Sequence, residues 1–210
     1  MSRDGAPPLR YLALGDSYTI GEGIDAEGRW PLQLARALRA GGIALDDPRI
    51  IATTGWTTDE LDAAIDAAPP EGGFGLVSLL IGVNNQYRGR DVAQYRREFD
   101  GLLARAAGFA GGRAGRVLAL SIPDWGVTPF ARRSGRDRVR IARELDAHNA
   151  AAREACGARG IAFVDITAAS RARGGEAEML AEDGLHPSAA MYALWVRLAL
   201  PTARRLLSRP

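Results

Sequence analysis

The sequence predicts an α/β fold, a three-layer α/β/α sandwich with about five parallel strands, and three observations support this prediction. Strand-like runs rich in Val, Ile and Leu alternate with helix-like segments along the chain, as the crossover units of a parallel sheet do. Runs such as LVSLLI at 76–81 are almost entirely apolar, which is typical of strands buried on both faces. The 210 residues suffice for one full core, so we expect a single domain over residues 1–210.

The expected elements follow from these alternating patterns. We expect strands at 10–14, 49–52, 76–81, 116–122 and 162–166, and helices at 31–40, 58–68, 91–109, 137–159 and 188–207. Thr57 and Glu60 have the spacing of a capping box at the start of the second helix. Glycine-rich stretches at 68–73 and 110–115 end two helices before the next strand begins.

The composition excludes several classes of chemistry. All 27 basic residues are arginine, so Schiff bases, Ser–Lys dyads and phosphate-binding P-loops are absent. Cys156 is the single cysteine, which excludes an internal disulfide or a thiolate metal cluster. It lies in a helical pattern, where we interpret it as a buried small side chain. No metal ligands cluster in the sequence, and we expect neither metal nor cofactor.

Charge and hydropathy suggest a protein of the cytoplasm. The net charge of +2 indicates no particular partner, and we expect no binding to nucleic acid. The longest apolar run, 74–83, is about half as long as a membrane span. The N-terminal MSRDGAPPLR lacks the apolar core of a signal peptide. We therefore expect no membrane span and a cytoplasmic location, and the oligomeric state stays open.

Polar residues gather where the predicted strands end. The candidates follow one of the first three strands or precede the last helix: Gly15, Asp16, Ser17, Gly55, Asn84, Asp183 and His186. The carboxyl ends of strands in such a sheet meet at one edge, where ligands bind. A hydroxyl, an imidazole, a carboxylate and amide donors are the groups that acyl transfer requires.

These motifs resemble those of the SGNH hydrolases, the GDSL-type esterases and lipases. The resemblance rests on GDSYTIGEG, Gly55, GVNN and DGLHP, in that family's order. It implies a flavodoxin-like fold and ester hydrolysis through an acyl-enzyme. Ser17 would be the nucleophile, His186 the base and Asp183 its orienting carboxylate. The backbone amides of Ser17 and Gly55 and the side chain of Asn84 would form the oxyanion hole.

The candidates also have plainer interpretations. Gly55 could serve a simple turn, Asn84 could cap a loop, and Asp183 with His186 could be a helix cap beside a surface histidine. Asp16 is better interpreted as an anchor of its turn than as a second acid. Asn85 stands where the commonest family wording has Asp, which leaves open how its loop is steadied.

The remaining candidates have a structural interpretation or two alternative ones. His148 lies in the middle of a predicted helix, and we assign it an ordinary structural role. Trp125 and Phe130 either line an acyl or alcohol pocket or cover the core under a long loop. The basic run at 132–140 could meet an anionic substrate or nucleic acid, but no aromatic residues interleave it, so a solvated helix start is favoured.

Rival classes fit less well. GEGIDAEG lacks the G-x-G-x-x-G spacing of a phosphate- or flavin-binding loop. An α/β-hydrolase elbow would need glycine where Thr19 stands. A non-catalytic protein that binds a small ligand is a third alternative. Among substrates we expect small or short-chain esters, and alternatives are O-acetylated carbohydrates, lysophospholipids and thioesters.

Overall fold

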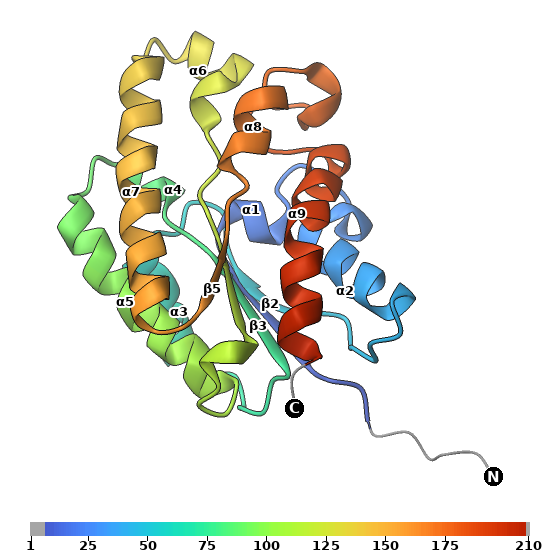
Figure 1. Ribbon diagram of the computed structural model, residues 1–210. Helices are drawn as coiled ribbons and strands as arrows, with labels where there is room; N and C mark the ends of the chain where they lie inside the picture. Colours follow the sequence, from blue (N-terminus) through green and yellow to red (C-terminus); the bar gives the residue numbers. More distant parts are fainter. Residues whose placement is uncertain (1–6, 209–210) are drawn as a thin grey trace.

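The computed structural model describes residues 7–208 and contains one parallel five-stranded sheet (Figure 1). Its strands are β1 (Tyr11–Gly15), β2 (Arg49–Ala52), β3 (Leu76–Leu80), β4 (Val117–Leu120) and β5 (Ala162–Val164). The order is β2-β1-β3-β4-β5, and every neighbouring pair is parallel. This is the doubly wound, flavodoxin-like order, and the predicted fold class is confirmed. The first six residues of the amino-terminal segment lie outside the described part.

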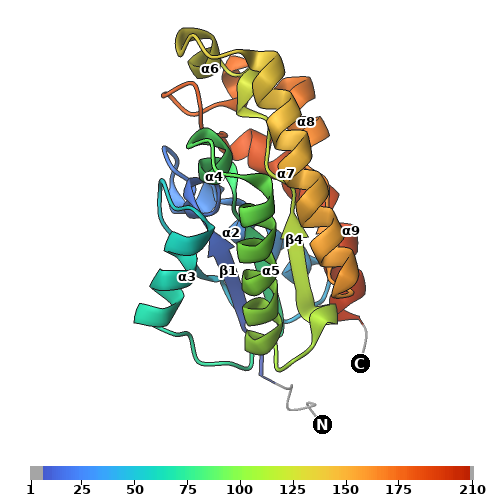
Figure 2. The ribbon, with the colours of Figure 1, turned by 90° about the vertical axis from the view of Figure 1, so that its left-hand side faces the viewer.

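Helices cover both faces of the sheet (Figures 1 and 2). One face carries α2 (Trp30–Ala40) packed against α9 (Ala189–Leu207). The other carries α3 (Thr58–Ala67), α5 (Val92–Phe109) and α7 (Arg138–Ala158), with α5 packed against α7. These five helices match the expected ranges to within one residue at each end. Thr57 and Glu60 form the expected capping box, in which the Thr57 amide donates to the Glu60 carboxylate at 2.8 Å.

Three strands are shorter than expected: β3 by one residue, and β4 and β5 by more. In β4 and β5, side chains take over backbone hydrogen bonds at the missing carboxyl ends. β4 ends at Leu120, and the Asn149 side chain then pairs with both the amide (2.7 Å) and the carbonyl (3.0 Å) of Ile122. β5 ends at Val164, and the amide of Ile166 donates to the Ser121 hydroxyl at 2.8 Å. At the other end of β4, Arg116 belongs to a 3₁₀ turn.

Short helices lie beyond the carboxyl ends of the strands. They are α1 (Ser17–Ile20), α4 (Val83–Tyr87), α6 (Pro129–Arg133) and α8 (Thr167–Arg173), with 3₁₀ turns at Ala26–Gly28, Ala114–Arg116, Trp125–Val127 and Ala177–Met179 elsewhere in the chain. Figure 1 shows α1, α4, α6 and α8 gathered around one end of the sheet. Helices of four to seven residues are too short for hydrophobic periodicity to reveal, and the sequence did not predict them.

Two residues that we interpreted as structural lie in the core. The thiol of Cys156 is fully buried, and burial raises its pKa to about 12, so it is a poor nucleophile. His148 is buried against Tyr95, its Nδ1 lies 2.8 Å from the Glu144 carbonyl, and burial lowers its pKa. Within residues 7–208, none of the helices has the length and apolar character of a membrane span.

Candidate active site

The turn from β1 into α1 presents Ser17 at the edge of the sheet. Gly15 ends the strand in a space where a Cβ would lie 2.4 Å from the Leu80 carbonyl oxygen, so only glycine fits. Asp16 is the N-cap of α1, and its Oδ1 accepts a hydrogen bond from the Tyr18 amide at 3.0 Å. Ser17 is the first helical residue, a position whose amide has no partner within the helix. The expected anchoring role of Asp16 matches this geometry.

Gly55 and Asn84 lie in neighbouring loops that a side-chain contact joins. Gly55 follows β2 with a φ of +89°, a left-handed conformation that favours glycine. In the part of the chain from 7 to 208, its amide donates no hydrogen bond. Asn84, in α4, donates one of its two amide hydrogens to the carbonyl of Trp56 at 2.9 Å. This contact fixes the side chain and leaves its second N–H for a ligand.

Asn85 answers the question of how this loop is held. It is fully buried; its Oδ1 accepts from the Thr58 amide (3.1 Å), and its Nδ2 donates to the Thr58 hydroxyl (2.6 Å). The same hydroxyl donates to Glu98 of α5. Asn85 thus ties α4 to the start of α3.

Asp183 and His186 share one turn before α9. Asp183 Oδ2 lies 2.5 Å from His186 Nδ1, while its Oδ1 accepts from the backbone amides of Leu185 (2.8 Å) and His186 (2.9 Å). Partial burial pushes the pKa of Asp183 up, but these hydrogen bonds outweigh it and leave the pKa below its ordinary value. The carboxylate therefore stays ionised and holds the ring with Nε2 pointing away from it.

One pocket of about 210 Å³ brings the candidates together. The sequence-predicted residues on its wall are Ser17, Gly55, Asn84, Trp125, Phe130 and His186. Asp183 is not on the wall and contacts the pocket only through His186. Within the described chain, Ser17 Oγ and His186 Nε2 are not hydrogen-bonded to each other; this contact often tightens only when substrate binds.

The sequence did not predict several walls of this pocket: Tyr18, Thr54, Val83, Tyr87 and Leu185. Two of them had a usable signal. Tyr18 follows the candidate nucleophile, and Tyr87 is three residues after Asn84, on the same side of a helical turn. Trp125 both covers the core and lines the pocket. Its side chain is 2% exposed and its Nε1 donates to Gln86 at 2.8 Å, and it is also part of the pocket wall.

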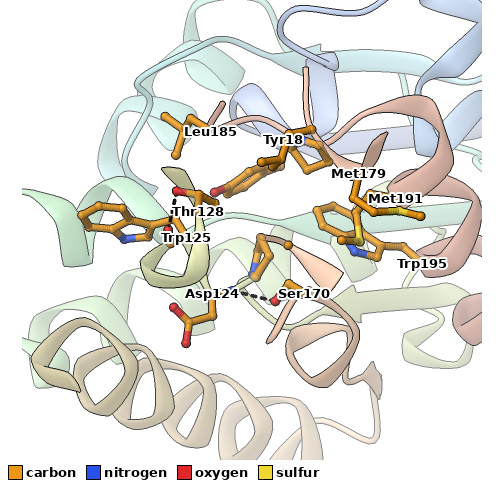
Figure 3. A pocket seen from close by; sticks show the side chains of 13 residues that line it. Tyr18, Asp124, Trp125, Thr128, Ser170, Met179, Leu185, Met191 and Trp195 are labelled. Carbon is orange, nitrogen blue, oxygen red and sulfur yellow. Dashed lines mark hydrogen bonds between the residues drawn. The ribbon is translucent and has the colours of Figure 1, made fainter. Parts of the chain in front are cut away.

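Behind this pocket lies a small inner cavity of about 20 Å³, which shares Tyr18, Trp125 and Leu185 as a partition (Figure 3). Met179, Met191 and Trp195 line it at one end, as the figure shows. The volume is close to that of a single water-sized probe. Ser17, Gly55, Asn84 and His186 line the larger, outer pocket and not this cavity.

Complete burial raises the pKa of Asp16 to about 7, although its carboxylate accepts the Tyr18 amide. Its Oδ2 has no hydrogen-bond partner in the described structure.

From residue 7 to residue 208, no group of His, Cys, Asp and Glu side chains is arranged to hold a metal ion.

Comparison with protein families gives a match over residues 13–194 to the GDSL-like lipase/acylhydrolase family. The chain belongs to this family. A comparison with curated proteins gave no match. The matched range includes the GDS turn, GVNN and DGLHP.

Solved structures of other proteins share the fold. The lipase Lip_vut3 from a goat rumen metagenome has a TM-score of 0.75 at 18% identity, covering 94% of this chain and 99% of that one. TesA has a TM-score of 0.67 at 22% identity, covering 94% and 99%. The psychrotrophic esterase EstA from Pseudoalteromonas sp. has a TM-score of 0.68 at 16% identity, covering 96% and 100%. At these identities the likeness concerns the fold.

Proposed function

We propose that this GDSL-family protein is a carboxylic ester hydrolase that works through a Ser17–His186–Asp183 triad and an acyl-enzyme. The observation that carries the proposal is that Ser17, Gly55, Asn84 and His186 line one pocket. Each belongs to a different segment beyond the sheet: Ser17 to α1, Gly55 to the loop after β2, Asn84 to α4 and His186 to the turn before α9. No local turn chemistry therefore accounts for their meeting.

The proposed reaction has two halves. Ser17 Oγ attacks the ester carbonyl carbon while His186 Nε2 takes the hydroxyl proton. The carbonyl oxygen becomes an oxyanion and accepts hydrogen bonds from the amides of Ser17 and Gly55 and from the Asn84 side chain. His186 returns the proton to the departing alcohol oxygen, and the acyl group stays on Ser17. His186 then deprotonates a water molecule, which attacks the acyl carbon. The bond between that carbon and Ser17 Oγ breaks, His186 returns the proton to Ser17 Oγ, and the carboxylic acid leaves.

The pocket's size and lining support small or short-chain esters. Its volume of about 210 Å³ is below the range of about 300–1,000 Å³ that drug-sized ligands occupy. Aromatic side chains dominate the wall: Tyr18, Tyr87, Trp125 and Phe130. Such a lining suits an apolar acyl or alcohol group better than a hydroxyl-rich sugar.

The test is hydrolysis of 4-nitrophenyl esters from acetate to decanoate by wild type, Ser17→Ala and His186→Ala. We expect activity to fall by roughly 10⁴-fold or more in both variants, as in other triads, and to be highest for a short acyl chain. His148→Gln is the matched control, because His148 is the other of the two histidines and lies outside the pocket. Equal rates in wild type and Ser17→Ala would overturn the proposal in favour of a non-catalytic binding protein.

A further inference from the structure

A second pocket, which we call the arginine groove, adjoins the proposed active site. Its volume is about 400 Å³, and it is lined on the α4 side by Gln86, Tyr87 and Arg88 and on the α7 side by Arg136, Arg140 and Glu144. Tyr87 belongs to the walls of both pockets. It is 38% exposed, so its ring forms a solvent-facing boundary between the two pockets.

Arg136 lies over this aromatic wall. Its guanidinium carbon lies 3.9 Å from the centre of the Tyr87 ring and 5.8 Å from that of Trp125. One guanidinium nitrogen donates to the Tyr87 carbonyl at 2.9 Å. The guanidinium group is planar, and an arginine over an aromatic ring can still use its remaining N–H groups to bind a carboxylate or a phosphate.

The other charges of the groove are already engaged. Arg140 pairs with Glu144 at 2.7 Å, and Glu144 also accepts from Gln86 at 2.8 Å. Arg88 pairs with Glu60 at 3.1 Å. Asp137 caps α7 by accepting from the amides of Val139 and Arg140. By contrast, within residues 7–208 Arg136 has no carboxylate at salt-bridge distance.

The groove is also joined to the proposed oxyanion hole. Arg88 donates to the carbonyl of Gly55 at 2.7 Å, and Gly55 lines the pocket at Ser17. An anion beside Arg136 would thus lie next to the loop that holds the ester carbonyl. The basic run at 132–140 does meet aromatic rings, but Tyr87 comes from a distant part of the chain, which is why the run alone favoured a solvated helix start.

We propose that Arg136 determines specificity by binding an anionic group of the substrate, so that the preferred ester carries a carboxylate or phosphate within reach of the arginine groove. This inference rests on the proposed ester hydrolysis. It narrows the substrate class from small esters in general to small esters that carry an anionic group.

The test compares anionic esters with their neutral methylated partners. The anionic probes are 4-nitrophenyl hydrogen succinate, 4-acetoxybenzoate and 4-acetoxyphenyl phosphate, which place a carboxylate on the acyl side, a carboxylate on the alcohol side and a phosphate on the alcohol side. Charge also changes the intrinsic reactivity of an ester. The measured quantity is therefore the anionic-to-neutral ratio of kcat/KM in wild type divided by the same ratio in Arg136→Gln.

We expect this quotient to be about 10 or more for at least one probe, the usual size of one charge-assisted contact, with the effect mainly in KM. The probe that gives the largest quotient identifies the anion and its side. Arg136→Lys should keep part of the preference, because it keeps the charge but loses the planar fork. The quotient should shrink as salt rises from about 0.05 M to about 0.5 M. The matched control is Arg197→Gln on the exposed side of α9, outside both pockets, which should leave the ratio at the wild-type value.

A quotient near one for all three probes would overturn the inference. That result differs from a failure of the proposed function, which is scored separately with neutral 4-nitrophenyl butyrate and Ser17→Ala. Neutral hydrolysis that depends on Ser17, together with a quotient near one, would leave the esterase standing and remove the anionic specificity. Thermal melting of each variant shows whether it is folded, so that an unfolded Arg136→Gln is replaced by Arg136→Lys and the same quotient is measured against it.

Discussion

Asn84 and Asn85 are neighbours in α4, but the side chain of Asn84 faces the pocket and that of Asn85 faces the interior. Asn84 reaches the carbonyl of Trp56 at 2.9 Å and lines the pocket, whereas Asn85 is fully buried and binds both the amide and the hydroxyl of Thr58. A helix turns by about 100° per residue, so adjacent residues face different surroundings. This difference supplies a matched pair for testing the proposed oxyanion hole.

For Asn84→Ala we expect kcat to fall by roughly 10²–10³-fold with little change in KM, the loss typical of one oxyanion donor. For Asn85→Ala we expect the free energy of unfolding to fall by about 1–3 kcal/mol, because the Thr58 amide loses its buried partner. Steady-state kinetics and urea unfolding of both variants measure these effects. A catalytic loss in Asn85→Ala as large as in Asn84→Ala would count against the assignment of Asn84.

Asn85→Asp exchanges the buried amide for a carboxyl group, and we expect it to destabilise this protein by about 1–3 kcal/mol at neutral pH. Asn85 Nδ2 lies 3.5 Å from a carboxylate oxygen of the half-buried Glu98, so an aspartate at the buried position 85 would place two anions side by side. Adding Glu98→Gln should restore most of the stability, as measured by thermal unfolding. An Asn85→Asp variant as stable as wild type, with Glu98→Gln giving no gain, would show that the two side chains are not coupled.

Asp16 should make stability depend on pH. Burial raises its pKa in the folded protein from 3.8 to about 7, so the folded state favours the protonated form. Stability from this group is therefore full below about pH 4 and is lost as pH rises through about 7. Asp16→Asn keeps the acceptor for the Tyr18 amide and removes the charge. We expect its stability relative to wild type to improve by about 1–4 kcal/mol between about pH 4 and pH 8, as measured by urea unfolding. A difference that stays constant with pH would show that Asp16 is not the titrating group.

Leu185 separates the proposed active-site pocket from the inner cavity. Leu185→Ala removes part of the wall between the pocket and the cavity. Because the two spaces then join, the acyl-chain length that is hydrolysed fastest should increase. Because Leu185 is only half-buried, the loss of its side chain should lower the free energy of unfolding by about 1 kcal/mol. The 4-nitrophenyl ester series measures the optimum. Leu198→Ala, an exposed leucine of α9, is the control, and an unchanged optimum in Leu185→Ala would mean that the inner cavity is not reachable from Ser17.

The sequence predicted the sheet, the five long helices and the place of the candidate residues, because apolar periodicity and strand-end position are local or topological signals. It did not predict what depends on contacts distant in the chain. The ends of β4 and β5 follow from Asn149 and Ser121 side chains that replace ladder partners.

The same limit applies to the site. Tyr87 and Leu185 become pocket walls only when α4 and the turn at 183–186 meet. Arg136 gains its aromatic neighbours only when the start of α7 packs beside α4. No spacing rule within one segment contains that information.

The central claim, that Ser17 is the nucleophile of an acyl-enzyme, is tested most directly by trapping it. Wild type and Ser17→Ala are treated with a 4-nitrophenyl alkylphosphonate, and the intact mass and the modified peptide are determined by mass spectrometry. We expect one phosphonyl group per chain, located on Ser17, loss of esterase activity in step with labelling, and no label in Ser17→Ala. Labelling of another residue, or inactivation without a label on Ser17, would contradict the proposed mechanism.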